Sequence, residues 1–420
     1  MLKGYVLFGL SLSLILLSTQ TYAQSSGLND LPFKTTLKGY LTYKQYQTFE
    51  NVAATDPFTK KETDLRAFEL KGEYYLTPKS ELEFEIEFEH GGTGSSLEYD
   101  QLEEFGEFEA EHEKGGEVVL SEFYYRHALE NQTWIRVGKI PVYLSLGSVQ
   151  ESYLFYPTIL ASSAEASMLP SEWREIAVEL QKRFGGYNVR ASVLNGLNSE
   201  FFRKYNWIGG GYQTQFETSL AGSLAGSVAL EYGDIALDDG IVAAVYYGEV
   251  SKNRNKQRKL NNESTLTIGS VFGSWHFDIL GQNFGLRGQF IHGTLSHSDE
   301  ISLANATLTS SANPGAFAPI GHEAQLEMIE VSYDAYTTDD TKLSGYYNYQ
   351  HVDTMKSVEG SILKDDRYNQ VTSAFGLIQK WEKVMFVKAE YAKHSNALPA
   401  LPSTSEFTLA FGFDWHGFNL

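Results

Sequence analysis

A row of alternating glutamates is the strongest chemical feature of this 420-residue chain. Between residues 81 and 89 every second residue is a glutamate, and each residue between two glutamates is apolar. Successive side chains of a strand point to opposite faces, so this spacing collects the carboxylates on one face. A wall of carboxylates attracts cations; the alternative is a hydrated face with no selective effect. The glutamates are Glu81, Glu83, Glu85, Glu87 and Glu89, and the alternation just before them adds Glu69 and Glu73.

Charges of both signs follow in the next alternating segments. Glu175, Glu179 and Arg183 share one strand face, and Arg126, Arg136 and Arg190 alternate with uncharged neighbours in the same way. A basic side facing an acidic side would create a transverse field that orders water and filters dipolar solutes. The alternative is ion pairing between adjacent strands. Both interpretations place these residues on the water-facing side of the strands.

Other chemistries find no support in the sequence. The chain has no cysteine, which excludes thiol nucleophiles and thiolate metal sites. It has no His-x-Ser triplet of the kind that barrel phospholipases use, since Thr294 stands at that spacing from His292. We therefore expect no catalytic residue, no metal site and no cofactor. A net charge of −20 argues against nucleic-acid partners, which require basic patches.

The elements that position these residues are strands, because a period of two dominates the chain. Mean hydropathy is −0.28, yet aromatic residues make up 14%. A transmembrane barrel accounts for both values, because only every second residue of its strands faces lipid. The predicted strands span 36–49, 64–76, 81–90, 117–128, 132–139, 173–183, 187–194, 226–233, 240–249, 264–277, 285–297, 323–336, 341–351, 369–380, 384–393 and 405–415.

The connections between these strands alternate between short and long. Tight turns are predicted at residues 77–80, 130–131, 185–186 and 382–383, whereas 91–116, 140–172, 195–225 and 298–322 are long. Short periplasmic turns and long extracellular loops characterise outer-membrane barrels. We therefore predict an all-β, antiparallel up-and-down barrel of about sixteen strands, a size that leaves an aqueous channel. The 140–172 segment is rich in apolar residues, and we expect it to fold into the lumen and constrict it.

The N-terminus predicts export. Lys3 precedes an apolar run, Tyr5 to Leu17, that is too short to span a bilayer, and Thr21-Tyr22-Ala23 resembles a signal-peptidase site. We expect a signal peptide over residues 1–23, cleavage after Ala23, and a barrel over 24–420 in the outer membrane of a Gram-negative bacterium. Expected partners are the membrane lipid, lipopolysaccharide and the barrel-assembly machinery.

Several short motifs occur in order along the chain. They are Arg136-Val137-Gly138-Lys139-Ile140-Pro141, Trp173-Arg174-Glu175-Ile176-Ala177-Val178, Asn195-Gly196-Leu197-Asn198, Phe201-Phe202, Trp207-Ile208-Gly209-Gly210 and Tyr346-Tyr347-Asn348-Tyr349. Together they resemble porins related to the phosphate-selective porin O and P family. The resemblance implies a sixteen-stranded channel for small ions or solutes, often a homotrimer. It does not carry phosphate selectivity to this chain, because inward carboxylates outnumber inward basic residues here. The alternative is a channel for polysaccharide or another specific substrate, for which Tyr75, Tyr124 and Tyr346 are the candidate lumen aromatics.

Overall fold

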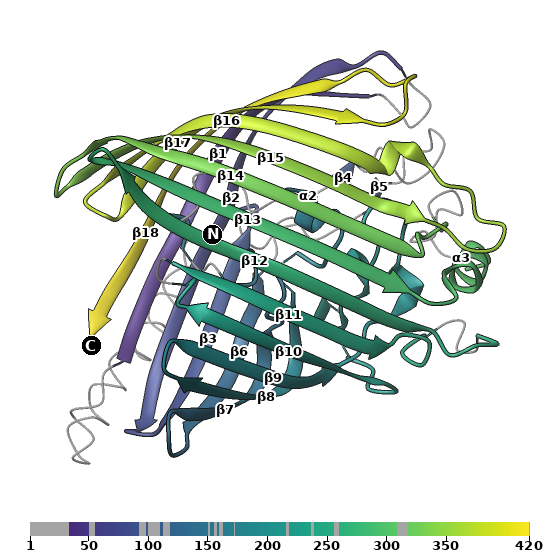
Figure 1. The fold of residues 1–420 in the computed structure, drawn as a ribbon, viewed down its shortest axis with the longest axis horizontal. Helices are drawn as coiled ribbons and strands as arrows, with labels where there is room; N and C mark the ends of the chain where they lie inside the picture. The colour runs from purple at the N-terminus through teal and green to yellow at the C-terminus, as the bar shows by residue number, and fades with distance from the viewer. Residues whose placement is uncertain are drawn as a thin grey trace, which may run out of the picture.

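The fold is a single closed barrel of antiparallel strands, seen in a computed structural model (Figure 1). The structure describes residues 33–49, 55–91, 98–99, 110–111, 118–149, 152–154, 158, 163–171, 173–215, 218–236, 239–255, 260–308 and 318–419. The predicted signal peptide and most of the acidic 91–116 segment lie outside these ranges. Within them, no helix is long and apolar enough to cross a membrane.

Sixteen strands form the barrel, which confirms the predicted number. The first eight are β1 (Phe33–Thr48), β2 (Phe58–Thr77), β3 (Ser80–Glu89), β6 (Val118–Ala128), β7 (Thr133–Pro141), β8 (Arg174–Phe184), β9 (Tyr187–Asn195) and β10 (Leu224–Gly233). The second eight are β11 (Gly240–Glu249), β12 (Thr265–Ile279), β13 (Gln282–Leu295), β14 (Glu323–Thr337), β15 (Thr341–Ser357), β16 (Asn369–Trp381), β17 (Met385–Asn396) and β18 (Thr404–Asn419).

The barrel closes where the first strand meets the last. Lys34 of β1 pairs with Asn419 of β18, and the ladder continues to Tyr46 opposite Glu406. In Figure 1 the purple β1 therefore lies beside the yellow β18. This pairing leaves no sheet edge exposed. A β-sheet in lipid requires such closure, because unpaired backbone groups at an edge would have no water to bind.

The predicted alternation of connections is confirmed, so the barrel has a short-turn end and a long-loop end. Two short turns need left-handed backbone at both central residues, as a tight hairpin requires: Leu280-Gly281 has φ of 57° and 79°, and Glu382-Lys383 has 50° and 55°. The long loops carry the remaining elements. These are the two-stranded sheet of β4 (Glu98–Tyr99) and β5 (Ala110–Glu111), the helices α2 (Ser163–Ala166) and α3 (Ser298–Ala306), and the 3₁₀ turns η1 (Ser199–Phe201), η2 (Gly209–Gly211), η3 (Gln213–Gln215) and η4 (Asp366–Tyr368).

Two strands extend well beyond their predicted ends. The structure begins β2 at Phe58 rather than at residue 64, and β15 runs on to Ser357 rather than to 351. Residues 59–64 carry charged or hydroxyl side chains at every position, so no apolar alternation marks them as strand. These extensions lie at the long-loop end, where a hairpin can continue beyond the apolar belt of the barrel.

Candidate functional site

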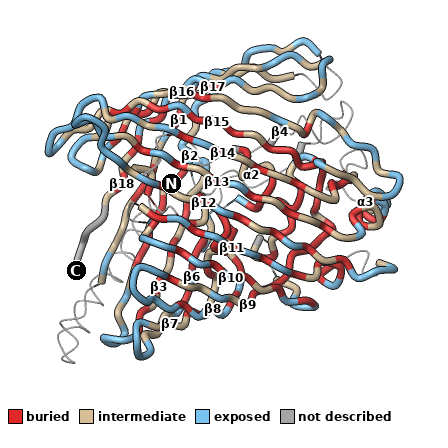
Figure 2. The backbone as a smooth tube through the Cα atoms, in the orientation of Figure 1, coloured by how far each residue is buried: buried red, intermediate tan, exposed pale blue. Residues whose placement is uncertain are grey.

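On β1–β3 and β6–β9 the barrel carries charged side chains inside and apolar side chains outside. On β3 the four glutamates from Glu81 to Glu87 are buried, at 1% to 5% exposure. On β8 the apolar Ile176, Val178 and Leu180 are about half exposed, at 47% to 51%. Figure 2 shows this alternation of buried and exposed positions along the strands. The exposed face is the outer surface, so the buried charged residues face the barrel interior.

Two lysines from β1 and β2 contact the glutamates of the interior face. Lys71 Nζ lies 2.7 Å from Glu83 Oε1. Lys38 forms an ion pair with Glu69 and lies 3.8 Å from Glu85. All five side chains are at most 8% exposed. The carboxylates are therefore largely neutralised by cations on the neighbouring strands.

Arg174 and Glu122 extend this pairing beyond β3. Arg174, at the first residue of β8, lies 3.0 Å from Glu122 of β6 and 3.4 Å from Glu85. Nearer the short-turn end, Arg126 Nε lies 2.8 Å from Glu81. These ion pairs join β6 to β3 and join β8 to both β6 and β3, so they connect adjacent strands and also strands that are not adjacent in the barrel.

Glu179 is the centre of a third group, on β8. Arg136 of β7 donates two hydrogen bonds to its Oε1, at 2.6 and 3.0 Å, and Arg190 of β9 donates a third at 3.3 Å. The two guanidinium groups also lie over aromatic rings, 5.2 Å from the centre of Tyr124 and 4.4 Å from that of Tyr143. Pairing between adjacent strands, one of the two interpretations of these charges, is present in the structure. We call the inward face of β1–β3 and β6–β9 the ion-paired wall.

The other predicted residues occupy different environments. Glu87 is buried and Glu89 half-buried on the same face of β3. Glu73 is half-buried, 3.5 Å from Lys34. These carboxylates lie toward the two ends of the β2–β3 ladder, beyond its central pairs.

Arg183 and Glu175 lie at opposite ends of β8. Arg183 is half exposed at the short-turn end, where it pairs with Asp234 at 3.2 Å. Glu175 is fully buried beneath a loop and accepts a 2.8 Å hydrogen bond from the backbone N–H of Gln213. These two residues therefore lie apart from the ion pairs around Glu179.

Sequence reasoning did not select Lys38, Lys71, Glu122 and Arg174, which complete the ion-paired wall. The signal was present for Lys38, because Leu37, Gly39 and Leu41 alternate with Lys38, Tyr40 and Thr42. Alternation shows which face a side chain occupies, but it does not show the register that places one strand beside another.

The candidate lumen tyrosines do not form an aromatic ladder. Tyr75 accepts a hydrogen bond from Lys34 at 3.0 Å, Tyr124 lies under Arg136, and Tyr346 donates to Glu390 at 2.6 Å. Among the described residues no ring contact joins these three tyrosines. The contacts of these tyrosines are polar, unlike a stacked sugar path.

The segment between β7 and β8 crosses the barrel interior, as predicted. The backbone N–H of Leu146 donates to Gln289 of β13 at 3.2 Å, and that of Ala164 donates to Gln350 of β15 at 3.0 Å. Further along, Lys388 of β17 donates to the carbonyl of Tyr153 at 2.8 Å. These contacts lead from one side of the barrel to the other, so the segment narrows the interior. We call the described residues between 142 and 173 the crossing loop.

Glu165 holds the crossing loop in its folded shape. Its carboxylate accepts hydrogen bonds from the Ser145 hydroxyl, from the backbone N–H of Gly147 at 3.3 Å and from Gln289 at 3.2 Å. Burial raises the pKa of Glu165, and these hydrogen bonds offset only part of that rise. Glu165 therefore binds a proton more readily in the folded loop than in the unfolded chain.

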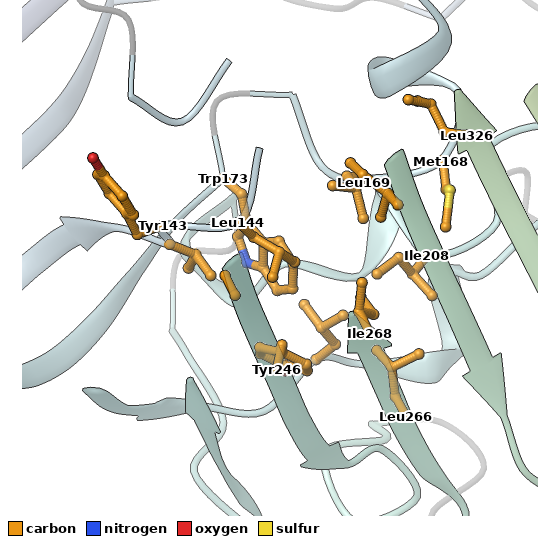
Figure 3. Close-up of a cluster of buried hydrophobic side chains, with 14 of the residues drawn as sticks. Tyr143, Leu144, Met168, Leu169, Trp173, Ile208, Tyr246, Leu266, Ile268 and Leu326 are labelled. Atoms are coloured by element: carbon orange, nitrogen blue, oxygen red, sulfur yellow. The ribbon is translucent and has the colours of Figure 1, made fainter. Parts of the chain in front are cut away.

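An apolar cluster fills the interior on the side of β10–β14. Figure 3 shows Leu144, Met168, Leu169 and Trp173 of the crossing loop, with Ile208 of the next long loop, packed toward these strands. We call the buried apolar side chains on the inward face of β10–β14 the apolar wall. Its buried side chains include Ala225, Ala229, Val242, Ala244, Tyr246, Leu266, Ile268, Phe272, Ile291, Leu295, Ala324, Leu326 and Met328.

Trp207 packs the loop between β9 and β10, which we call the Trp207 loop, against the apolar wall. Its indole N–H donates to the carbonyl of Gly321 at 2.9 Å, and its side chain is fully buried. Gly293 of β13 lies directly beneath the ring, where a Cβ atom would come within 2.1 Å of Trp207 Cη2. Glycine at this position allows the close approach.

A salt bridge between loops stabilises the long-loop end. Lys204 lies 3.2 Å from Asp365, which also accepts hydrogen bonds from Arg367. Partial burial acts to raise the pKa of Asp365, but the hydrogen bonds from Arg367 and Lys204 outweigh it and lower that pKa to about 2. Among the described residues, no group of three or more His, Asp or Glu side chains has the arrangement of a metal site.

The fold and the polar interior define a barrel of the porin type, with sixteen strands and an inward-folded loop. No family model and no curated protein matches the chain. Among solved structures it is similar to Salmonella typhi OmpF in complex with daunomycin, with 12% identity, a TM-score of 0.52 and coverage of 91% of this chain and 97% of that one.

Two further structures show the same fold. An anion-selective porin from Comamonas acidovorans is 12% identical with a TM-score of 0.50, covering 91% of this chain and 100% of the other. The outer-membrane channel DcaP of Acinetobacter baumannii is 10% identical with a TM-score of 0.50, covering 92% and 97%. At these identities the likeness establishes the barrel architecture. The resemblance to the phosphate-selective porin family stays a prediction.

Proposed function

We propose that this chain is an outer-membrane porin, a passive water-filled channel for small ions and solutes. The observation that carries the proposal is the polarity of the closed barrel: charged side chains inside, apolar side chains outside. Sixteen strands are enough to enclose an aqueous channel, and the crossing loop narrows it. Export by the predicted signal peptide, contact with lipopolysaccharide, insertion by the barrel-assembly machinery and a homotrimeric state belong to the same proposal.

We propose further that the ion-paired wall lines the channel and makes it weakly cation-preferring. The lining residues are the acidic Glu69, Glu73, Glu81, Glu83, Glu85, Glu87, Glu89 and Glu179 and the basic Arg126, Arg136, Arg183 and Arg190; Glu175, predicted with them, is covered by a loop. Carboxylates outnumber cations on β1–β3 and β6, which favours cations. Because lysines and arginines pair with the central carboxylates, the preference is expected to be small, and phosphate selectivity is not expected.

Conductance in planar bilayers tests the channel itself. Purified barrel should give discrete current steps, and absence of any conductance would overturn the porin proposal. Replacing Glu83→Gln and Glu85→Gln together should lower the ratio of K⁺ to Cl⁻ permeability, measured from the reversal potential in a KCl gradient.

A matched double variant separates the wall from the total charge. Glu323→Gln with Glu327→Gln removes the same charge from β14. These two side chains lie on the outward face of the strand, because the alternating Ala324 and Leu326 point inward and are buried. This control should leave the permeability ratio unchanged. Equal shifts in both double variants would contradict a selective role for the wall.

A further inference from the structure

A cavity of about 590 Å³ lies at the short-turn end of the barrel, between the ends of β12–β16. The crossing loop borders it through Leu154. Four basic side chains line it, Arg287, Lys342, Lys380 and Lys383. It lies away from the glutamates of β3, on strands that the predicted site did not include.

The basic residues of this cavity are not matched one to one by carboxylates. Lys342 pairs with Asp334 at 2.6 Å, and Arg287 with Glu330 at 3.2 Å. Lys380 donates to the main-chain carbonyl of Leu154 and forms no ion pair within the described part of the chain.

The charges of Lys342 and Arg287 repel Lys380, whereas those of Asp334 and Asp414 attract it. The aspartates lie beyond ion-pair distance of Lys380, whose side chain donates to a main-chain carbonyl instead. A negative group bound beside Lys380 would complete its contacts within the cavity.

The rim of the same cavity is rich in hydroxyl and carboxylate groups. Thr337, Thr338 and Thr341 line it together with Asp339 and Asp340 of the β14–β15 turn. Hydroxyl groups of a solute can donate to aspartates and both donate to and accept from threonines. The cavity volume lies within the range of about 300–1,000 Å³ that is usual for small-molecule sites.

We propose that this cavity is a binding site for a small hydroxylated carboxylic acid. The carboxylate lies between Lys380 and Lys383, and the hydroxyl groups face the threonines and aspartates of the β14–β15 turn. The site goes beyond passive diffusion, because it would hold one class of solute at one end of the channel.

Isothermal titration calorimetry of the folded barrel in detergent tests the site without ion flow, so a failure here is distinguishable from absent conductance. Gluconate is the probe, glucose its uncharged match, and inorganic phosphate an anion without the carbon-bound hydroxyls. Gluconate should bind, glucose should not, and phosphate should bind more weakly. Absence of gluconate binding, or equal binding of phosphate, would overturn the proposal.

Two variants connect binding to the cavity. Lys380→Met should weaken gluconate binding about tenfold, because a charged donor to the carboxylate is lost. Since Lys380 also contacts the crossing loop, Lys383→Gln, an exposed residue in the β16–β17 turn, provides a second test and should weaken binding less. Lys182→Met, exposed at the same end on β8, is the matched control and should change nothing. Unchanged affinity in both cavity variants would place any bound gluconate elsewhere and refute the site.

Discussion

The two sides of the barrel interior share the same strand alternation but bury different chemical groups. The ion-paired wall keeps charged groups inside the barrel by placing each central carboxylate next to a lysine or arginine. The apolar wall instead covers its inward side chains with the crossing loop and the Trp207 loop. Inward position alone therefore does not define a channel lining. The crossing loop also reaches the ion-paired wall, where Tyr153 donates a hydrogen bond to Glu69 and Tyr143 lies under Arg190, so the two walls differ in the chemistry of these contacts.

The largest expected effect of a single substitution lies on the apolar wall. Trp207→Ala should lower the free energy of unfolding by about 3–5 kcal/mol, because a fully buried indole leaves a cavity above Gly293. Trp275→Ala is the matched control, since Trp275 is 48% exposed on the outer face, and should cost only about 0.5 kcal/mol. Urea unfolding followed by far-ultraviolet circular dichroism measures both. Equal losses would show that the loop contributes no packing.

The next effect concerns the ion-paired wall. Arg136→Gln removes two hydrogen bonds to Glu179, which keeps Arg190 as a partner. Because hydrogen bonds to buried charged groups contribute about 1.5–3 kcal/mol, unfolding should become easier by about that amount. The same urea titration checks it. A variant as stable as the parent would show that water replaces the arginine at no cost.

The crossing loop should respond to pH through Glu165. Burial raises the pKa of Glu165 above its unfolded value, so the stabilisation from its protonated form is fully present below the unfolded pKa and is lost as pH rises through the folded pKa. Single-channel currents should therefore fluctuate more at neutral than at mildly acidic pH.

Glu165→Gln should remove most of this pH dependence, because an amide keeps the neutral hydrogen bonding. Arg287 and Glu330 border the same small cavity as Glu165, and this substitution leaves the charges of both residues unchanged. Glu263→Gln, on an exposed loop, should behave like the parent. A pH response that persists unchanged in Glu165→Gln would assign it to other groups.

The smallest expected effect is at Arg183. Its pair with Asp234 is 45% and 32% exposed, and surface pairs contribute about 0–1 kcal/mol. Arg183→Gln should therefore change stability by less than Arg136→Gln and leave the permeability ratio nearly unchanged. A loss of stability as large as that of Arg136→Gln would show that this exposed pair at the short-turn end contributes as much as the buried pairs of the ion-paired wall.

The positions of the strands were predictable because their physical cause is local. Alternation at Glu81–Glu89 or Phe407–Trp415 reflects two different solvents on the two faces of one strand, and this needs no knowledge of neighbours. The turn at Gly185-Gly186 was predictable for the same reason, and Gly185 does adopt positive φ there.

The partners of the charges were not predictable in the same way. Lys38 reaches Glu85 across β2, and Arg174 reaches Glu122 although 52 residues separate them. Such contacts depend on barrel register, which no single segment encodes. Likewise, the aperiodic crossing loop showed an apolar composition but not which strands it would cover. The sequence therefore predicted the row of glutamates, but it did not predict the lysines and arginines that pair with them.

The reversal potential of Lys71→Met in a KCl gradient tests the central claim most directly. Lys71 lies 2.7 Å from Glu83 and 3.7 Å from Glu122, so removing its charge should expose carboxylates to the channel water. The potential should move toward that of a K⁺-selective pore, opposite to the shift from Glu83→Gln. If Lys71→Met leaves the reversal potential unchanged, or moves it in the same direction as Glu83→Gln, the ion-paired wall does not set the selectivity of the channel.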